Sequence, residues 1–198
     1  MINEALKFIS DEVNKYLSIK LGPVTDPRLV LGNVARLQDS DQGGTTNPMA
    51  NRAILTLVNI EEDRISKSPD NFRRNLDSNS VSYKNPRVYL NLYCLFSINR
   101  NTYDDALKWL ALVVQFFQYR NVFTRENSPG MDDKLERLVL DLYSMNFEQV
   151  NHLWATLGGK YYPSALYKMR MVVIDDDTKE AEAGLITEVN ISENQVNN

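Results

Sequence analysis

Apolar residues alternate with period two over residues 88–98, and this run leads almost directly into a stretch with helical periodicity. From Val88 to Ile98 every second residue is apolar, and the residues between them, such as Tyr93 and Leu95, are largely apolar too. Such a run predicts an interior strand that is covered on both faces. We expect the rest of the chain to be arranged around this strand and the helix that follows it.

The helix after the central strand is predicted to begin near Tyr103. Thr102 and Asp105 have the spacing at which a cap side chain and a first-turn carboxylate satisfy free helix amides. Apolar residues then follow a three-to-four spacing up to Phe117, but Trp109 and two others lie off that stripe. A helix that is apolar on several sides needs a second covering surface, which is either another layer of the same fold or a subunit interface.

Further elements are expected on both sides of this unit. An amphipathic helix runs from Ile2 to Gly22-Pro23, and the mixed charges of its polar face favour packing on a sheet over binding a membrane surface. Strands are expected over 29–37, 52–63, 122–124 and 164–174, and the second should pair near the central strand. Residues 135–144 fit a helix or a strand. We favour a strand, because Asn146 and Gln149 form a cap pair for a separate helix over 147–157.

Residues 64–85 contain few apolar side chains and are predicted to form a long loop. Within it, Lys67, Arg73 and Arg74 could contact phosphate or an acidic protein surface, while Phe72 could anchor a partner. This segment is the best candidate for a docking element, and a solvated hairpin tip is the alternative.

The chain is predicted to form one domain over residues 1–175, followed by a C-terminal extension over 176–198. In the extension only Gly184–Ile191 has strand character, and it could extend an edge of this sheet or of a neighbour. Leu185, Ile186 and Val189 are therefore further candidate partner contacts. The three aspartates at 175–177 lack the glycine and later glutamate of a calcium loop, so we interpret them as a solvated strand end.

Charge and composition narrow the class of protein. With 22 basic and 26 acidic residues the net charge is −4, which argues against a dedicated nucleic-acid binder. No apolar stretch approaches the ~20 residues of a membrane helix, and the start of the chain has acids where a secretory signal needs a basic head. The single cysteine, Cys94, falls in the central alternation and is expected in the core. These features predict a protein that folds in the cytoplasm.

Catalytic and metal-binding constellations are not recognisable in the sequence. The one histidine, His152, has no partner pattern for catalysis or metal binding, and Gly43-Gly44-Thr45-Thr46 lacks the wider glycine spacing and lysine of a phosphate loop. We therefore expect neither an enzyme nor a bound cofactor or metal ion. A small hydrolase or other enzyme on an α/β scaffold stays open as an alternative, in which replacing His152 and Cys94 would abolish an activity.

Several long, irregular stretches support a family resemblance. NIEEDRIS, KNPRVYLNLYCLF and SMNFEQVNHLWATLGGKYYPS, together with ALKWLALVVQFFQYRNVFT and GLITEVNI, resemble the tail-terminator, or tube-cap, proteins of extracellular phage-tail-like contractile injection systems. The similarity spans nearly the whole chain in order. It implies an α/β (α+β) fold, with a mixed, mostly antiparallel sheet and flanking helices.

The resemblance also implies a function. Such proteins are expected to form a six-membered ring on the distal end of the inner tube, to end tube and sheath polymerisation and to couple the sheath to the tube. The implied partners are further copies of the chain, the inner tube protein and the sheath protein, with no nucleic acid and no membrane. Assembly is expected in the cytoplasm, on a particle that can be released outside the cell. A baseplate or completion adaptor of the same particle is the alternative.

Overall fold

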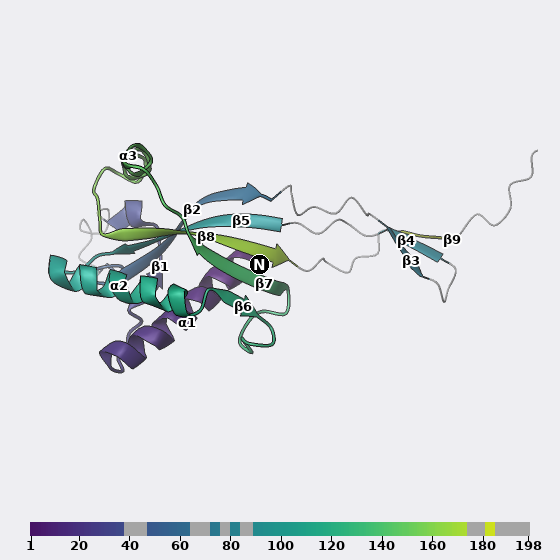
Figure 1. The fold of residues 1–198 in the computed structure, drawn as a ribbon, viewed down its shortest axis with the longest axis horizontal. Coiled ribbons are helices and arrows are strands. Elements are labelled where there is room, and N and C mark those ends of the chain that lie inside the picture. Colours follow the sequence, from purple (N-terminus) through teal and green to yellow (C-terminus); the bar gives the residue numbers. More distant parts are fainter. Residues whose placement is uncertain (38–46, 64–71, 76–79, 84–88, 174–180, 185–198) are drawn as a thin grey trace, which may run out of the picture.

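The computed structural model describes residues 1–37, 47–63, 72–75, 80–83, 89–173 and 181–184. Most of these residues belong to one six-stranded sheet with helices on both faces (Figure 1). A second, three-stranded sheet is formed by short segments from the middle and the end of the chain. Within the described residues, no helix combines the length and the apolar character that a membrane span requires.

The six-stranded sheet has the order β1-β2-β5-β8-β7-β6. Its strands are β1 (Leu29–Leu31), β2 (Ala53–Glu62), β5 (Tyr89–Ile98), β8 (Ser164–Val173), β7 (Leu135–Leu142) and β6 (Val122–Thr124). Only the pairing of β1 with β2 is parallel, and the other pairs in this sheet are antiparallel. The predicted central strand therefore lies inside the sheet, between β2 and β8.

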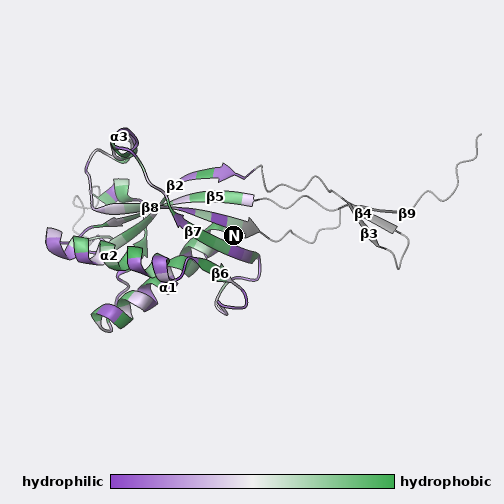
Figure 2. Cartoon of the chain, in the orientation of Figure 1, coloured by the Kyte–Doolittle hydropathy of each residue, from purple (hydrophilic) through white to green (hydrophobic). Residues whose placement is uncertain are grey.

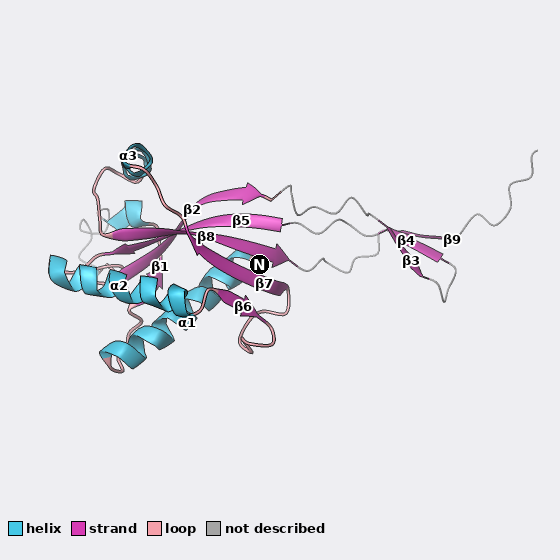
Figure 3. Cartoon of the chain, in the orientation of Figure 1, coloured by secondary structure: helices cyan, strands magenta, loops and turns pink. Residues whose placement is uncertain are grey.

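Two helices cover one face of the sheet and a third covers part of the other face (Figures 1 and 3). The helices α1 (Ile2–Leu21) and α2 (Tyr103–Tyr119) pack on the face that carries Leu92, Cys94 and Phe96 of β5. The helix α3 (Phe147–Thr156) packs on the opposite face, against Leu95 and Leu166. This α/β (α+β) arrangement matches the expected fold class.

The larger of the two cores is built around aromatic side chains. Phe96 and Phe117 lie with ring centroids 5.2 Å apart, and Tyr167 is 4.6 Å from Phe117. Phe8 of α1 meets Phe123 of β6 edge-on at 5.6 Å, so α1 reaches the last strand of the sheet. Figure 2 shows apolar and polar positions alternating along α1 and α2, and the apolar ones include Ile9 and Val113, which are buried in this core. Aromatic pairs of this geometry add to the energy of burial and fix how the helices sit.

The smaller core fastens α3 to the sheet. Asn146 and Gln149 form the expected reciprocal cap, with hydrogen bonds of 2.8 and 3.0 Å. Trp154 is buried and contacts the rings of Tyr161 and Tyr162 at 5.6 and 6.0 Å. After the helix, Gly158 and Gly159 adopt positive φ angles of 100° and 80°, which favours glycine and turns the chain toward β8.

Most predicted elements are confirmed. The helices begin at Ile2, Tyr103 and Phe147, and the strand interpretation of 135–144 is correct over Leu135–Leu142. The strand expected over 29–37 is wrong in its second half, because β1 ends at Leu31 and a 3-10 helix, η1, spans Val34–Leu37. The side chain of Asn33 accepts a hydrogen bond from the Ala35 amide at 3.0 Å, a local bond that favours a turn over an extended strand.

The long loop expected over 64–85 also needs correction, whereas the strand expected at 184–191 lies outside the described residues except for Gly184. The described part of 64–85 contains β3 (Phe72–Asn75) and β4 (Ser80–Tyr83), which form an antiparallel pair. The tail contributes β9 (Ala181–Gly184), which ends where the predicted strand should begin, and β9 pairs with β4. Backbone pairing thus gives strand structure to short polar segments whose composition alone indicates a loop. The three aspartates at 175–177 and the glycine stretch at 43–46 lie outside the described residues.

The helix α2 is covered on only part of its circumference. The sheet covers Val113 and Phe117, and Tyr16 of α1 packs against Phe116 at 5.4 Å. Trp109 is half-buried under the guanidinium of Arg100 at 4.3 Å, whereas Tyr103 and Leu107 remain 65% and 44% exposed. The fold therefore supplies the expected second covering surface for one side of α2 and leaves a partly apolar strip at the surface.

Candidate functional site

The predicted docking segment over 64–85 and the C-terminal extension meet in the three-stranded sheet, whose order is β3-β4-β9. Phe72, Arg73 and Arg74 belong to β3 and lie opposite Tyr83, Ser82 and Val81 of β4. On the other side of β4, Ser80 lies opposite Gly184 of the tail. Lys67, Leu185, Ile186 and Val189 lie outside the described residues. The structure thus joins the docking segment and the start of the C-terminal extension through one shared strand.

Residues considered for catalysis are not brought together in a reactive arrangement. Cys94 is 1% exposed, as predicted, and burial raises the pKa of its thiol to about 12, which keeps it protonated and unreactive. His152 is exposed on α3. Among the described residues, no three His, Cys, Asp or Glu side chains are grouped closely enough to hold a metal ion.

The half of the sheet face that α3 leaves uncovered carries a polar ladder. Tyr93 donates a hydrogen bond to Glu61 at 2.8 Å, and the ammonium of Lys168 lies 5.8 Å from the centre of the Tyr93 ring. Arg170 donates to Asp141 at 2.6 Å. Burial, reinforced by the hydrogen bond to Glu61, raises the pKa of Tyr93 to about 12. This face is suited to polar contacts with another surface.

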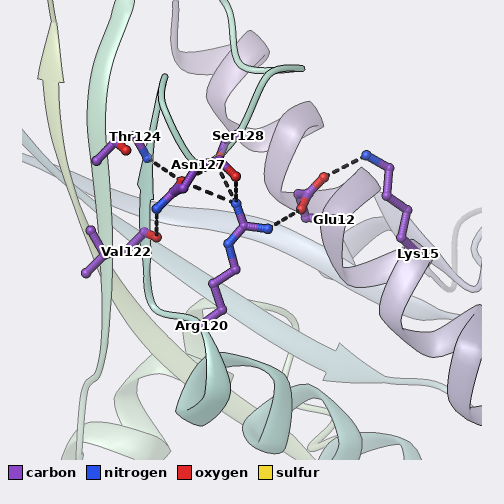
Figure 4. A network of polar contacts seen from close by, with 7 residues as sticks. All are labelled: Glu12, Lys15, Arg120, Val122, Thr124, Asn127 and Ser128. Atoms are coloured by element: carbon purple, nitrogen blue, oxygen red, sulfur yellow. Dashed lines mark hydrogen bonds and ion pairs between the residues drawn. The ribbon is translucent and has the colours of Figure 1, made fainter.

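Arg120 organises the best-connected polar cluster in the described part of the chain, at the point where α2 turns into β6 (Figure 4). Its guanidinium binds Glu12 of α1 at 2.9 Å, and it donates to the backbone oxygen of Asn127 and to Ser128 Oγ, each at 2.6 Å. The same guanidinium lies 4.7 Å from the centre of the Phe123 ring. The cluster joins α1, α2, β6 and the loop after β6 into one rigid unit.

Several large apolar side chains are exposed on the described surface. Phe147 is 94% exposed at the first turn of α3, where the double cap holds the backbone in place. The other strongly exposed members of this group are Tyr119, Ile19, Tyr103, Tyr161, Leu142, Met1 and Val24. Ile19 and Val24 border a groove of about 790 Å³ between the end of α1 and the segment that leads to β1. Apolar side chains scattered singly over a surface are ordinary in folded proteins and do not by themselves mark a binding site.

Sequence reasoning did not identify Asn14, Arg120 and Asn127, which make the most informative polar contacts. Asn14 lies on the polar face of an amphipathic helix, and Asn127 lies in an ordinary polar connector. The Asn-Ser-Pro-Gly run at 127–130 was a signal for a turn, but not for the bonds that Asn127 makes. These contacts join residues that are distant in the chain, and a local pattern cannot show them.

Comparison with known proteins identifies a matching family and two solved structures with a similar fold. The model of a family described as the Pvc16 N-terminal domain matches residues 5–188. A cryo-EM structure of the sheath/tube terminator of PVC, an extracellular contractile injection system, in its extended state shares the fold with a TM-score of 0.55 and 14% identity; the match covers 94% of this chain and 64% of that one. The anti-feeding prophage cap, a tube terminating cap, has a TM-score of 0.56 and 14% identity, with 92% and 59% covered.

The coverage and identity of these matches show the family and the fold of the chain. No curated protein sequence matches the chain. The chain spans less than two thirds of the length of either terminator structure, and at this identity the likeness shows a common fold. The resemblance to terminators of contractile injection systems is confirmed by the family match and by both structures. From residue 5 to residue 188, this chain belongs to the Pvc16 N-terminal domain family.

Proposed function

We propose that this protein is a structural cap of a contractile injection system. In this proposal it forms a hexameric ring on the distal end of the inner tube, ends tube and sheath polymerisation and couples the sheath to the tube. The observation that carries the proposal is the family match over 5–188, supported by the shared fold with a sheath/tube terminator and a tube terminating cap. The cap assembles in the cytoplasm and leaves the cell with the particle.

A cap of this kind needs a stiff body rather than a reactive site. A closed ring requires that each subunit present two different surfaces to its neighbours at a constant angle. A sheet with helices on both faces, in which Arg120 at the end of α2 also binds α1, supplies such a body. No covalent step is part of the proposed function, so no catalytic residue, cofactor or metal ion is assigned.

We assign partner contact to the small sheet and to the C-terminal extension over 176–198. Phe72, Arg73 and Arg74 of β3 are the proposed contacts of the hairpin, together with Lys67. Leu185, Ile186 and Val189 are the proposed contacts of the extension, which engages the sheath by adding a strand to it. Support comes from the pairing of β9 with β4, because a short strand from the extension already takes part in a sheet.

The solution mass tests the ring. Light scattering of the purified protein across concentration, alone and with tube protein, should give a ring in at least one condition. A monomer that ignores tube protein in every condition would contradict the proposal. Electron microscopy of labelled particles then decides position, because a cap lies at the end away from the baseplate and an adaptor lies elsewhere.

The contact assignment has its own test. Deleting 176–198, or combining Arg73→Glu with Arg74→Glu, should reduce the fraction of particles that keep their sheath, while Lys160→Glu serves as a control for surface charge reversal. Lys160 is exposed in the loop after α3. Normal sheath retention after the deletion would rule out engagement of the sheath by the extension, yet leave the ring test unaffected.

A further inference from the structure

Each end of the six-stranded sheet has a short edge strand, β1 on one side and β6 on the other. An edge strand has backbone donors and acceptors that face away from its neighbour, and a strand of another molecule can pair with them. Edges of this kind therefore need protection in a protein that is packed closely with copies of itself. At each edge strand, an asparagine side chain forms hydrogen bonds with backbone groups that face away from the neighbouring strand.

At β6, the pairing with β7 shows which groups face outward. The Leu140 amide donates to the Asn121 oxygen, so the alternating ladder directs Phe123 toward β7 and both Val122 and Thr124 away from it. Asn127 donates from Nδ2 to the Val122 oxygen at 3.2 Å and accepts from the Thr124 amide through Oδ1 at 2.9 Å (Figure 4). One residue of a parallel neighbouring strand would make the same two bonds.

At β1, the groups of Leu29 face outward. The backbone bonds to β2 are made by Arg28, which accepts from Ala53, and by Gly32, which donates to Leu55. The Leu29 amide donates to Asn14 Oδ1 at 2.8 Å, and Asn14 Nδ2 donates to the Leu29 oxygen, also at 2.8 Å. One residue of an antiparallel neighbouring strand would make this exchange of two bonds.

Neighbouring contacts hold both asparagines in place. Asn127 Oδ1 also accepts from Ser128 Oγ at 2.6 Å and from Arg120 at 3.3 Å, and Arg120 is itself bound to Glu12 of α1. Asn14 is part of α1, which packs on the sheet at Ala5, Ile9 and Val13. Because α1 carries Asn14 at one edge and binds Arg120 near the other, the same helix supports both asparagines.

We propose that Asn127 is an edge cap that keeps β6 from pairing with a strand of a second copy of this chain, and that Asn14 lets α1 cover the β1 edge by bonding the Leu29 groups, which lie beneath that helix. The carboxamides replace the bonds that a foreign strand would offer, so pairing gains nothing at these positions. Copies of the chain then meet through side-chain surfaces and not through the edges of the six-stranded sheet. This inference does not depend on the proposed cap function, because it concerns any close packing of copies.

The test removes the two asparagine side chains separately. Asn127→Ala should gain association: light scattering should show a mass that rises with concentration toward about twice that of the native protein, because strand pairing joins copies at the edge. Asn14→Ala should instead lower the urea midpoint without association, because Leu29 is 1% exposed beneath α1 and its amide and oxygen would lose their partners. A fluorescent peptide with the sequence of residues 119–126, which includes β6, should bind Asn127→Ala and should not bind the native protein. Ser128→Ala is the matched control, because it weakens the same cluster without removing either bond to the strand.

The proposal is overturned if Asn127→Ala keeps the native circular dichroism spectrum and also keeps the native mass at every concentration without binding the peptide, or if Asn14→Ala keeps the native urea midpoint. It is equally overturned if Ser128→Ala associates as strongly as Asn127→Ala, since loosening of the loop would then be the cause. Should Asn127→Ala fail to fold, hydrogen exchange of the native protein decides: the Thr124 and Leu29 amides should be protected, and exchange as fast as in an unfolded chain would exclude the caps.

Discussion

Replacing Arg120 by methionine should be among the most costly single changes at the polar surface. Methionine keeps a flexible apolar stem over Phe123 but removes the ion pair with Glu12 at 2.9 Å and the two hydrogen bonds of 2.6 Å to Asn127 and Ser128. The pair is largely shielded, with Arg120 27% and Glu12 13% exposed. Hydrogen bonds to charged groups contribute about 1.5–3 kcal/mol each. Residual exposure and the pairing of Lys15 with Glu12 at 2.6 Å offset part of the loss, so we expect about 2–4 kcal/mol.

Urea unfolding followed by circular dichroism measures this loss as a shift in midpoint at unchanged slope. Arg52→Met is the matched control, because Arg52 binds Asp26 at 3.3 Å and Asp26 is 78% exposed. A surface pair of this kind contributes about 0–1 kcal/mol. If Arg120→Met costs no more than Arg52→Met, the cluster around Arg120 is not what joins α1, α2 and β6.

Three further predictions concern packing, capping and pH. Phe96→Ala should lower the free energy of unfolding in urea by about 3–5 kcal/mol, because Phe96 is 0% exposed. Phe147→Ala should change it by no more than about 0.5 kcal/mol, because Phe147 is 94% exposed. Equal losses would contradict the assigned burial. Asn146→Ala should cost about 1 kcal/mol through loss of the α3 cap, and Asn151→Ala, on the exposed side of α3, should not. The pKa values of Tyr93 and Tyr167 are raised from 10.0 to about 12, so the neutral phenols stabilise the fold; this stability is present below pH 10 and is lost as the pH rises toward about 12. Unfolding free energy that stays constant over this pH range would refute the raised values.

The main elements could be predicted because each leaves a local pattern. The alternation over 88–98 marks β5, and the cap pair of Asn146 and Gln149 separates α3 from the strand before it. The same local rules failed at residues 64–85 and near Gly184, where strands form from short polar segments. Such segments become strands through pairing with each other, and composition does not carry that information.

The candidate partner contacts were also predictable only in part from the sequence. The sequence indicates Phe72, Arg73 and Arg74 as candidate docking residues, because they lie in a stretch with few apolar side chains and two of them are charged, but it gives no reason to connect them with the C-terminal extension. The structure connects them, because β4 pairs with β3 on one side and with β9 on the other. The sequence likewise could not predict the hydrogen bonds of Asn127 to β6 and of Asn14 to β1, since an asparagine on a helix or in a turn is ordinary.

The sequence by itself determined the interior strand, the three helices with their caps, and the membership in the Pvc16 N-terminal domain family, because periodicity, capping and long irregular motifs are all local features of the chain. Only the tertiary structure decided the strand order, the division into two cores and the bonds that occupy the edges of the sheet. These depend on which distant segments meet. Glu12 and Arg120 are 108 residues apart in the chain and form one ion pair, because the free energy of packing α1 against the sheet brings them together.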